Sequence, residues 1–514
     1  MSWLFLPAAI AVAALLLPPL ALALLWLRPA TPVRKKIFYT MPILLLGLVH
    51  LVKVYGLRYE MAGEGIPSFF TFRSKAQHQA DLEAHRAEQR KVPTETAAVA
   101  EASPAAVPSA DTVLAAEKPA PPVAAAPAIA NYWTDFRGPK RLGIYDEKPI
   151  LTAWPKSGLT RLWKQPVGGG YSSFVVAGGL AYTIEQRRDQ EVTAAYDMKT
   201  GREKWTNSWK GFFQESMGGD GPRATPVFDE GRIYALGAEG ELRVIDASNG
   251  QTVWRKNILQ ENGAQNLTWG QAATPLIVDG KVIVLPGGGG GKSVVAYDKA
   301  DGKTIWSSLD DEQAYTAPVV VEVAGKRQLI VVTAQRMAGL TVEDGKLLWE
   351  YPWVTEYHVN AAIPLVVAPN RVFISAGYGH GAAVVELTPD GDKFALKEVW
   401  KNGKIKTKFN DSVLFEGHVY GLDEGILSCV DVANGQQKWK GGRYGYGQII
   451  LAGGHLVITS EQGDVALVKA TPAKHEELAR FRAIDGKTWN HPAIADGVLL
   501  VRNETEMAAF RIGR

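Results

Sequence analysis

The sequence predicts an all-β domain, an eight-bladed β-propeller with four-stranded blades, preceded by an N-terminal transmembrane helical hairpin and a disordered linker. Three observations support this prediction. Two apolar stretches open the chain, an Ala/Pro-rich stretch follows, and a short motif ending in tryptophan then recurs along the rest of the chain. We therefore divide the 514 residues into three segments, 1–57, 58–130 and 131–514.

The first segment is predicted to hold two transmembrane helices, at 3–27 and 37–57. Residues 3–27 carry no charge, and 25 residues exceed the roughly 20 that cross a bilayer as a helix. The second stretch reaches spanning length if the charged end of Lys53 extends to the interface. The loop between them, RPATPVRKK, carries four basic residues, which favours a cytoplasmic location. We expect an anchor in the inner (plasma) membrane, with the later residues facing the periplasm or the exterior.

The alternative for residues 3–27 is a cleaved signal peptide. Such a peptide begins with a basic segment, and MSWLFLP carries no basic residue before the apolar stretch. Pro18 and Pro19 weaken a straight helix, so a kinked or re-entrant segment also stays open.

The second segment is predicted to be a tether. Residues 74–92 are rich in charge and indicate an exposed helix or a solvated coil. Residues 98–130 are almost wholly Ala, Pro, Val, Ser and Glu, a composition that buries too little apolar surface to fold and stays extended.

Four copies of one motif define the third segment. They read AYDMKTGREKW at 195–205, VIDASNGQTVW at 244–254, AYDKADGKTIW at 296–306 and CVDVANGQQKW at 429–439. Weaker copies end at Trp349, Trp400 and Phe481, and Trp163 stands alone near the start of the segment. Successive anchors lie 39 to 52 residues apart, close to the roughly 40 to 50 residues of a four-stranded propeller blade.

The repeated residues are predicted to have structural roles. The aspartate accepts hydrogen bonds from backbone N–H groups of its turn, and the glycine supplies a positive φ without steric cost. The tryptophan, on the outermost strand, wedges between adjacent blades and donates its N–H to a loop carbonyl. The residues are Asp197, Gly201, Trp205, Asp246, Gly250, Trp254, Asp298, Gly302, Trp306, Trp349, Asp431, Gly435 and Trp439.

Eight anchors but seven complete units imply that the ring closes on itself. The strand of Trp163 has no hairpin of its own, and the C-terminal segment GVLLVRNETEMAAFRIGR has no tryptophan strand. Pairing the two removes the exposed edges, as closed propellers do. Seven blades is the alternative if the unit ending at Phe481 is not a blade.

The YDxxTGxxxW pattern resembles the pyrroloquinoline-quinone-like (PQQ-like) repeat of the quinoprotein alcohol dehydrogenase-like superfamily, over residues 132–514. Members similar to quinoprotein dehydrogenases bind the quinone and calcium in the central funnel, many with an adjacent cysteine pair. Others resemble the propeller scaffold of outer-membrane protein assembly, which binds proteins and is anchored through an N-terminal cysteine. Cys429 is the one cysteine here, so the chain departs from both patterns.

Residues that open the innermost strands are predicted to crowd one rim of the central channel. A rim of polar and aromatic groups is typical of a ligand site, and the alternative is that the groups satisfy one another and channel water. Asp411 is the one carboxylate among them and is a weak candidate for a base or a calcium ligand. The candidates are Tyr171, Arg223, Thr225, Gln271, Tyr315, Asn360, Asn410, Asp411, Gln448, Trp489 and His491.

Other classes of function find little support in the sequence. A net charge of +3 gives no argument for nucleic acid, the histidines lack zinc-site spacing, and LPGGGGGKS lacks the first glycine of a phosphate loop. The aromatic stretches WTDFRGP and GFFQESMGGDGP are expected to be cap loops. We therefore expect a membrane-tethered, non-catalytic scaffold that binds proteins of the cell envelope. The alternative is a membrane-bound quinoprotein dehydrogenase that oxidises an alcohol or sugar with PQQ and calcium.

Overall fold

The computed structural model describes residues 10, 13–14, 17–29, 31–53, 56–91 and 132–514. They form two compact units, Met1–Asp81 and Leu82–Arg514. The Ala/Pro-rich stretch at 98–130 and residues 3–9 of the first predicted span lie outside the described residues.

Two adjacent helices dominate the first unit, α2 (Pro18–Leu27) and α3 (Val33–Lys53). Trp26 Nε1 donates to Thr40 Oγ1 at 3.0 Å, so the two helices lie side by side. α2 begins at Pro18 because a proline fits the first helical turn but not a helix interior. Of the described residues, α3 is the one helix long and apolar enough to cross a bilayer, and it lies four residues N-terminal to the predicted 37–57.

A hairpin that the sequence did not predict follows, β1 (Arg58–Met61) and β2 (Pro67–Thr71). Helix α4 (Lys75–Lys91) then covers the charged stretch, for which the sequence predicted a helix or a coil. Its residues from Leu82 onwards belong to the second unit.

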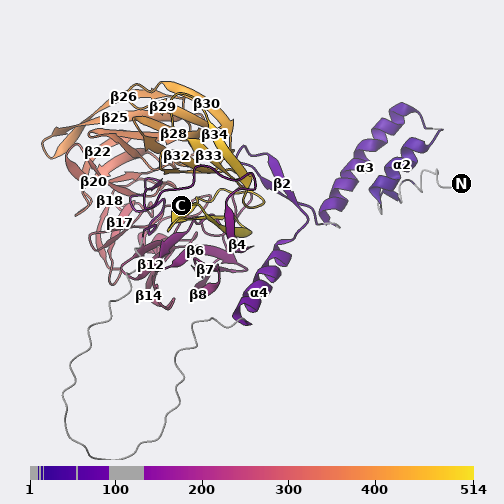
Figure 1. Cartoon of the computed structure of the whole chain (residues 1–514), viewed down its shortest axis with the longest axis horizontal. Coiled ribbons are helices and arrows are strands. Elements are labelled where there is room, and N and C mark those ends of the chain that lie inside the picture. The colour runs from indigo at the N-terminus through magenta and orange to yellow at the C-terminus, as the bar shows by residue number, and fades with distance from the viewer. Residues whose placement is uncertain (1–9, 11–12, 15–16, 30, 54–55, 92–131) are drawn as a thin grey trace, which may run out of the picture. The chain divides into compact units, whose positions relative to one another are not determined.

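Eight sheets arranged around a common axis make the second unit an eight-bladed propeller (Figure 1). Blades 1 to 4 are β5 (Val175–Ala177), β6 (Leu180–Arg187), β7 (Gln190–Asp197) and β8 (Glu203–Lys210); β11 (Val227–Asp229), β12 (Arg232–Leu236), β13 (Glu241–Asp246) and β14 (Thr252–Asn257); β15 (Leu276–Val278), β16 (Lys281–Val284), β17 (Val294–Asp298) and β18 (Thr304–Ser308); β19 (Val319–Val323), β20 (Lys326–Val332), β21 (Arg336–Leu340) and β22 (Leu347–Pro352).

The remaining blades follow in chain order, and each is antiparallel from its innermost to its outermost strand. Blades 5 to 8 are β23 (Leu365–Ala368), β24 (Arg371–Ala376), β25 (Gly381–Asp390) and β26 (Lys393–Asn402); β27 (Val413–Phe415), β28 (His418–Asp423), β29 (Ile426–Asp431) and β30 (Gln437–Arg443); β31 (Gln448–Ala452), β32 (His455–Thr459), β33 (Asp464–Lys469) and β34 (Glu477–Arg482); β35 (Ala493–Ala495), β36 (Val498–Arg502), β37 (Glu506–Arg511) and β4 (Thr160–Pro166). Outside the blades lie the short pair β9 (Gln214–Glu215) and β10 (Gly219–Asp220) and the helix α5 (Ile258–Asn262).

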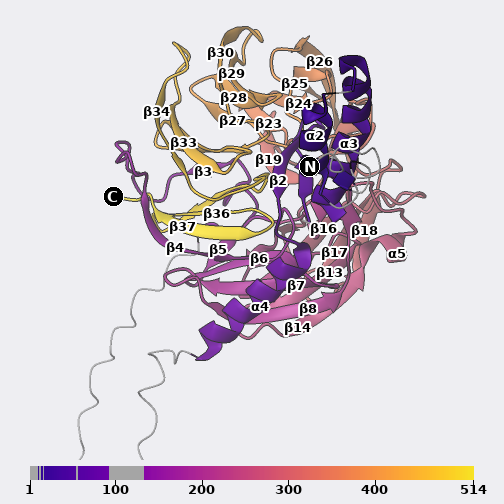
Figure 2. The same ribbon diagram turned by 90° about the vertical axis from the view of Figure 1, so that its right-hand side faces the viewer.

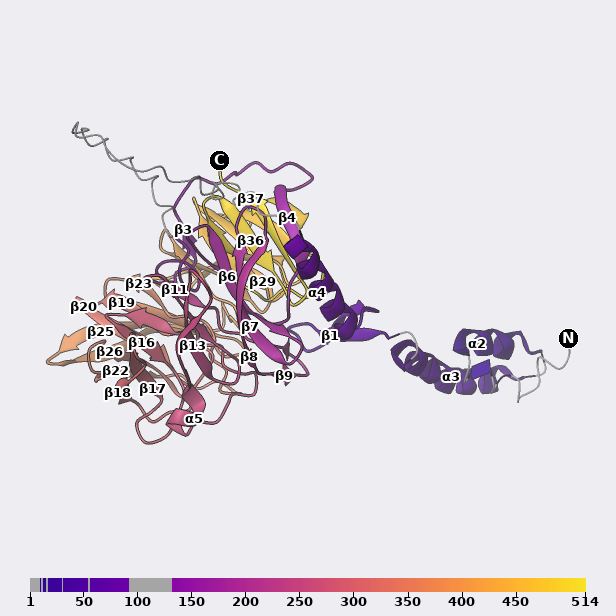
Figure 3. The ribbon, with the colours of Figure 1, turned by 90° about the horizontal axis from the view of Figure 1, so that it is seen from below.

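The ring closes as predicted. β4 pairs antiparallel with the C-terminal strand β37, with Trp163 opposite Ala509, and Figures 2 and 3 show the two strands next to each other. The unit ending at Phe481 is a true blade, so eight blades is confirmed and the alternative of seven is not needed. A short strand, β3 (Ile144–Tyr145), adds in parallel to β31 of blade 7.

The strand sequences follow from where each strand lies in its blade. Middle strands such as β13 (ELRVID) are buried along their length, because neighbouring blades cover both faces of the sheet. Outermost strands such as β8 (EKWTNSWK) alternate between covered and exposed side chains.

The repeated motif builds the contact between one blade and the next. Asp197 Oδ1 accepts from the backbone N–H of Lys199 at 3.1 Å and of Thr200 at 3.0 Å, which satisfies the turn. Trp205 Nε1 donates to Ala247 O of blade 2 at 3.0 Å. Its ring lies against Gly250, whose φ is +76° and where an added Cβ would lie 2.7 Å from Trp205 Cε3.

Other blades repeat this arrangement with two variations. The rings of Trp163, Trp254, Trp306 and Trp400 lie against Gly201, Gly302, Gly345 and Gly435 of the following blades. Trp349 differs, because its Nε1 donates to Gln328 Oε1 within its own blade at 2.6 Å. Trp306 is the second variation: its ring lies against the glycine of the next blade, but its Nε1 has no hydrogen-bond partner. The glycine is therefore required twice, for its backbone conformation and for the tryptophan of the preceding blade.

Candidate functional site

The predicted rim residues lie immediately before the innermost strands, and many of them connect neighbouring blades. Thr225, before β11, accepts at Oγ1 from Ser173 N of blade 1 at 3.0 Å and donates its own N–H to Thr274 Oγ1 of blade 3 at 3.1 Å. Tyr315 N, before β19, donates to Asn360 O of blade 5 at 2.9 Å.

The amide side chains of the rim also reach across blade boundaries. Gln448 Nε2 of blade 7 donates to Phe409 O at 3.2 Å and to Trp489 O at 2.9 Å, so it joins blades 6, 7 and 8. Asn360 Nδ2 donates to Thr333 O of blade 4 at 2.9 Å. By contrast, Asn410 Oδ1 accepts locally from Lys408 N. Several of these side chains therefore join neighbouring blades, while Asn360 Oδ1, Asn410 Nδ2 and Gln448 Oε1 are buried without a hydrogen-bond partner.

Gln271, buried before β15, also takes part in the contact between blades 2 and 3. Its N–H donates to Ala238 O at 2.9 Å and its Nε2 donates to Asn266 Oδ1 at 3.0 Å.

A plug, which we define as residues 132–145, closes one end of the axis. Its backbone carbonyls at Trp133 and Thr134 accept from Val176 N of blade 1 and Phe228 N of blade 2. The guanidinium of Arg141 donates to Pro318 O of blade 4 at 2.7 Å and to Pro275 O of blade 3. β3, at the end of the plug, pairs with blade 7. The stretch WTDFRGP is therefore a cap, as expected, and it contacts blades on all sides of the axis.

Arg137 of the plug reaches Asp411, the candidate carboxylate. Arg137 Nε lies 3.5 Å from Asp411 Oδ2, and Arg137 Nη2 donates to Ser412 O at 2.7 Å. The other oxygen, Asp411 Oδ1, accepts from Ile363 N of blade 5 at 2.6 Å. The side chains of Arg137 and Asp411 are 1% and 4% exposed, so water screens this pair little.

His491 lies on the same carboxylate, with Nε2 3.4 Å from Asp411 Oδ2, and its ring contacts Phe136 edge to face at 4.8 Å. Burial and then the charge of Arg137 lower the pKa of His491 well below its usual value, so the imidazole is neutral. Burial raises the pKa of Asp411, while Arg137 and Ile363 N oppose this effect. Both oxygens of Asp411 therefore contact groups of the protein.

Sequence reasoning did not single out Arg137 or Arg141. The available signal was a pair of arginines in a short Gly- and aromatic-rich stretch directly before the first strand (DFRGPKRLG). Arg141 also pairs with Asp135 inside the plug at 2.8 Å. The partners on the blades lie between 133 and 275 residues further along the chain, so only the closed ring brings them to the arginines.

A collar of aromatic and cationic side chains comes from loops of several blades, including those that lead into the innermost strands. Each ring or cation lies 4.3 to 5.6 Å from the next one. Trp489 and Arg223 of the predicted rim belong to it, and Lys487 lies over both Tyr171 and Trp489. In order, the collar contains Phe213, Arg223, Tyr171, Lys487, Trp489, Phe409, Tyr446, Lys408 and Tyr378.

Next to the collar, two loops expose large apolar side chains. Phe212 and Met217, between β8 and β11, are 47% and 44% exposed, and Val354 and Tyr357, between β22 and β23, are 51% and 59% exposed. The ring of Tyr357 lies 5.4 Å from that of Tyr378 in the collar. The stretch GFFQESMGGDGP, predicted to be a cap loop, thus presents apolar surface.

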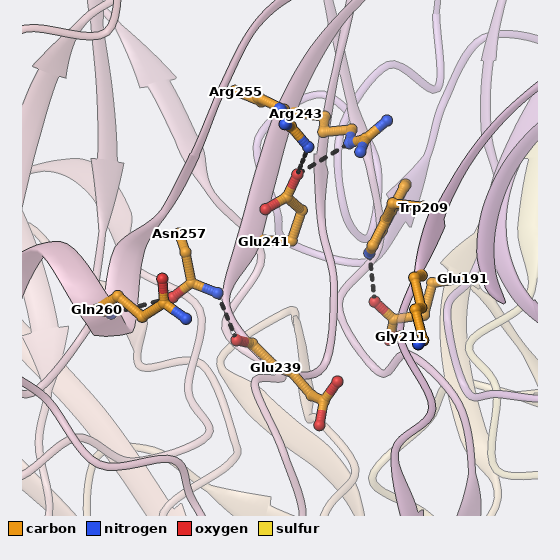
Figure 4. Close-up of a pocket in the computed structure, with 10 residues that line it drawn as sticks. Glu191, Trp209, Gly211, Glu239, Glu241, Arg243, Arg255, Asn257 and Gln260 are labelled. Atoms are coloured by element: carbon orange, nitrogen blue, oxygen red, sulfur yellow. Dashed lines mark hydrogen bonds and ion pairs between the residues drawn. The ribbon is translucent and has the colours of Figure 1, made fainter. Parts of the chain in front are cut away.

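A pocket of about 440 Å³ lies at the boundary of blades 1 and 2 (Figure 4). Glu191 lies at its base, 1% exposed, and accepts from Trp209 Nε1 and from Ala238 N of blade 2, each at 2.9 Å. Burial raises the pKa of Glu191 to about 7, although these two donors oppose the shift. At the rim, Glu241 pairs with Arg243 at 3.0 Å and Arg255 at 3.5 Å. The pocket therefore combines the ion pairs of Glu241 with a buried carboxyl, that of Glu191, which joins two blades.

The comparisons with known proteins agree with the repeat. The family described as "Outer membrane protein assembly factor BamB" matches residues 188–441. The curated BamB of Burkholderia pseudomallei is 25% identical over 234 residues, 42% of this chain and 54% of that protein. That of Escherichia coli is 25% identical over 201 residues, 37% of this chain and 49% of that protein. The chain spans about half the length of the curated relatives that it matches.

Among solved structures, the quinohemoprotein alcohol dehydrogenase of Comamonas testosteroni aligns with a TM-score of 0.51 at 12% identity, over 74% of this chain and 80% of that one. At this identity the likeness concerns the fold. The eight blades of the closed ring, the repeated Asp–Gly–Trp hairpins and this likeness of fold together define the class of protein. The chain is a β-propeller of the PQQ-like repeat type. The curated sequences it resembles are outer membrane protein assembly factors.

Proposed function

We propose that this chain is a membrane-anchored, extracytoplasmic propeller that acts as a non-catalytic, protein-binding scaffold of the cell envelope. One observation carries the proposal: the carboxylate in the best position for catalysis, Asp411, is occupied by Arg137, His491 and Ile363 N. The names of the curated relatives, outer membrane protein assembly factors, support the same class of function.

The residues of the axis do not fit a resident quinone and calcium. A calcium ion takes six to eight oxygen ligands, usually with carboxylates among them. Here Arg137 already neutralises Asp411 from inside the plug. In a dye-linked dehydrogenase assay, we expect no turnover of alcohols or aldoses by the full-length chain after reconstitution with the quinone and calcium. Reproducible turnover would contradict the proposal and favour the dehydrogenase.

The exposed loops beside the collar are the proposed contact surface. Aromatic residues, methionine and arginine are enriched at protein interfaces, and contiguous exposed apolar groups mark such surfaces. Among the described propeller residues, the other exposed large apolar side chains, Val253, Ile305 and Leu478, lie on the outermost strands of different blades. They provide matched controls of similar exposure.

Site-specific photo-crosslinking in native membranes tests this surface. We expect one partner, identified by mass spectrometry, to form adducts from positions 212 and 357 and none from positions 253 and 305. With that partner purified, Phe212→Ser/Tyr357→Ser should weaken binding at least tenfold, and Val253→Ser/Ile305→Ser less than twofold. Equal adducts at all four positions, or no adduct at 212 and 357, would contradict the proposal.

The anchor is proposed from the two apolar segments and the basic loop between them. α3 has the length to cross a bilayer, and α2 packs beside it. We expect the chain to resist alkaline extraction from membranes. In spheroplasts, an impermeant maleimide should label an exposed cysteine placed by Glu343→Cys, while buried Cys429 stays unlabelled. Labelling only after lysis of the inner membrane would overturn the orientation.

A further inference from the structure

The C-terminal part of α4 differs from a solvated helix. Residues 82–91 belong to the same compact unit as the propeller. Leu82 and Arg86 are 1% and 2% exposed, although the helix carries almost only charged and polar residues. An arginine is rarely this buried unless its donors are satisfied, so its surroundings indicate a specific contact.

Arg86 lies in a socket formed by Gln165, Pro166, Tyr196 and Glu203. Its Nη1 donates to Gln165 Oε1 at 3.0 Å, and its Nη2 donates to Pro166 O at 2.9 Å and to Tyr196 OH at 3.3 Å. Arg86 Nε lies 3.6 Å from Glu203 Oε2, and the guanidinium carbon lies 4.9 Å from the centre of the Tyr196 ring. The contacts thus combine several acceptors, one carboxylate and one aromatic face.

The socket suits a planar, multiply donating cation. Gln165 Nε2 donates to Gly201 O, which turns the amide oxygen of Gln165 toward the helix. The oxygens of Gln165, Pro166 and Glu203 then present acceptors at fixed positions, which match the fork of a guanidinium better than the single point charge of lysine.

The carboxylates around the socket are paired with arginines. Glu203 also pairs with Arg187 at 2.6 Å, and Arg187 pairs with buried Glu185 at 2.8 Å. Arg502, on the far side of Glu185, donates its hydrogen bonds to Thr183 and to backbone carbonyls. Removing Arg86 would leave Glu203 to share Arg187 with Glu185 and would take one donor each from Pro166 O and Tyr196 OH.

Neighbouring helix residues add further contacts on both sides of the socket. Gln89 Nε2 donates to Gln165 Oε1 at 2.7 Å, and Gln89 O accepts from Arg202 at 2.5 Å. Glu83 accepts from both Nε and Nη2 of Arg188, at 2.5 and 2.7 Å. Glu83, Arg86 and Gln89, three residues apart on one side of the helix, therefore all contact the propeller.

The socket lies at the closure of the ring. Gln165 and Pro166 belong to β4, the strand that completes blade 8 by pairing with β37. Tyr196 and Glu203 belong to β7 and β8 of blade 1. The helix therefore bridges the last blade and the first one.

We propose that this socket is a docking site for an arginine-bearing helix, and that its occupant is residues 82–91 of the same chain. The docked helix holds β4 against blade 1 and so secures the closure of the ring. This inference does not depend on the scaffold function.

Hydrogen exchange of the full-length chain in detergent tests the docking. An isolated helix of this length is marginal in water, so Arg86→Ala should increase exchange of the amides of residues 83–91 at least tenfold. Arg86→Lys should fall between Arg86→Ala and the unmodified chain. The matched control, Arg90→Ala, removes an exposed arginine from the same helix and should leave exchange within twofold.

Two further readouts keep the proposal open to refutation. If Arg86→Ala does not fold, Glu83→Ala on the exposed side of the contact should still speed exchange of the first docked turn. If the protection of residues 83–91 from exchange is unchanged when the chain is diluted from micromolar to nanomolar, the helix docks within its own chain. If protection is lost on dilution, the helix comes from a second copy, and the assignment of residues 82–91 of the same chain is wrong. Equal effects of Arg86→Ala and Arg90→Ala on amide exchange would show that the socket does not hold the helix.

Discussion

Glu191 gives the protein a pH-dependent stability that a single substitution should remove. The carboxyl is buried at the boundary of blades 1 and 2, and burial raises its pKa from 4.5 to about 7. A raised pKa means that the folded protein binds this proton more tightly than the unfolded chain does. The contribution of Glu191 to stability therefore increases as the pH falls below about 7 and is lost above it.

The size of this effect follows from the shift. Each pKa unit corresponds to about 1.4 kcal/mol, so a shift from 4.5 to about 7 changes the free energy of unfolding by about 2.5 kcal/mol between pH 8.5 and pH 5. For a propeller of this size, with an unfolding entropy of roughly 2 cal/mol/K per residue, that corresponds to about 3 °C in Tm.

The substitution Glu191→Gln imitates the protonated carboxyl. The amide oxygen can still accept from Trp209 Nε1 or from Ala238 N, as one carboxyl oxygen does now. We expect Tm of the variant to stay close to that of the unmodified chain at pH 5 and to lie about 3 °C above it at pH 8.5. Calorimetry over this pH range measures the difference directly.

The control is Glu322→Gln, which removes an exposed carboxylate of blade 4 that does not line the pocket. Its Tm should follow that of the unmodified chain at every pH. If the Glu191→Gln curve also runs parallel to the unmodified one from pH 5 to pH 8.5, the buried carboxyl does not titrate in this range and the reasoning fails.

Three other predictions concern the plug, the repeat and the cysteine. Arg137→Ala leaves Asp411 buried without its cation, so it should destabilise the protein by about 3 to 5 kcal/mol. Adding Asp411→Asn should recover part of this loss in a double-mutant cycle measured by denaturant unfolding. Additive effects of the two substitutions would show that Arg137 and Asp411 do not interact. Gly250→Ala places a Cβ against Trp205 and should destabilise the protein by about 2 to 4 kcal/mol. The control Gly231→Ala, with φ +78° and open space for its Cβ, should cost only about 1 kcal/mol. Equal losses of stability in calorimetry would show that the contact with tryptophan does not require glycine. Cys429 should resist iodoacetamide at pH 8 in the native state and react on unfolding, because burial raises the pKa of its thiol to about 11; rapid native alkylation followed by mass spectrometry would contradict this.

The fold was largely predictable from the sequence because its determinants are local and repeat. An Asp that satisfies its own turn, a glycine with positive φ and a tryptophan four residues after the glycine act within about a dozen residues. Their spacing revealed the blade length, and the unpaired strand of Trp163 indicated how the ring closes. The sequence also located the rim residues of the innermost strands.

The roles of those rim residues were not predictable, because they depend on partners that are distant along the chain. Asp411 looked like a candidate base until the plug placed Arg137 beside it. Gln448 and Thr225 were candidates for a ligand site, and the sequence did not show that they join blades. The stretch around Arg86 looked like a solvated helix, although its arginine is buried against Gln165 and Tyr196.

By itself, the sequence determined the apolar segments, the blade repeat and the closure, since each follows from composition or from hydrogen bonds and packing between residues close in the chain. Only the tertiary structure decided which charges are neutralised, which end of the axis is closed and where the charged helix docks. Closing the ring brings residues separated by hundreds of positions to within 4 Å, and the electrostatics of the buried groups depend on those contacts.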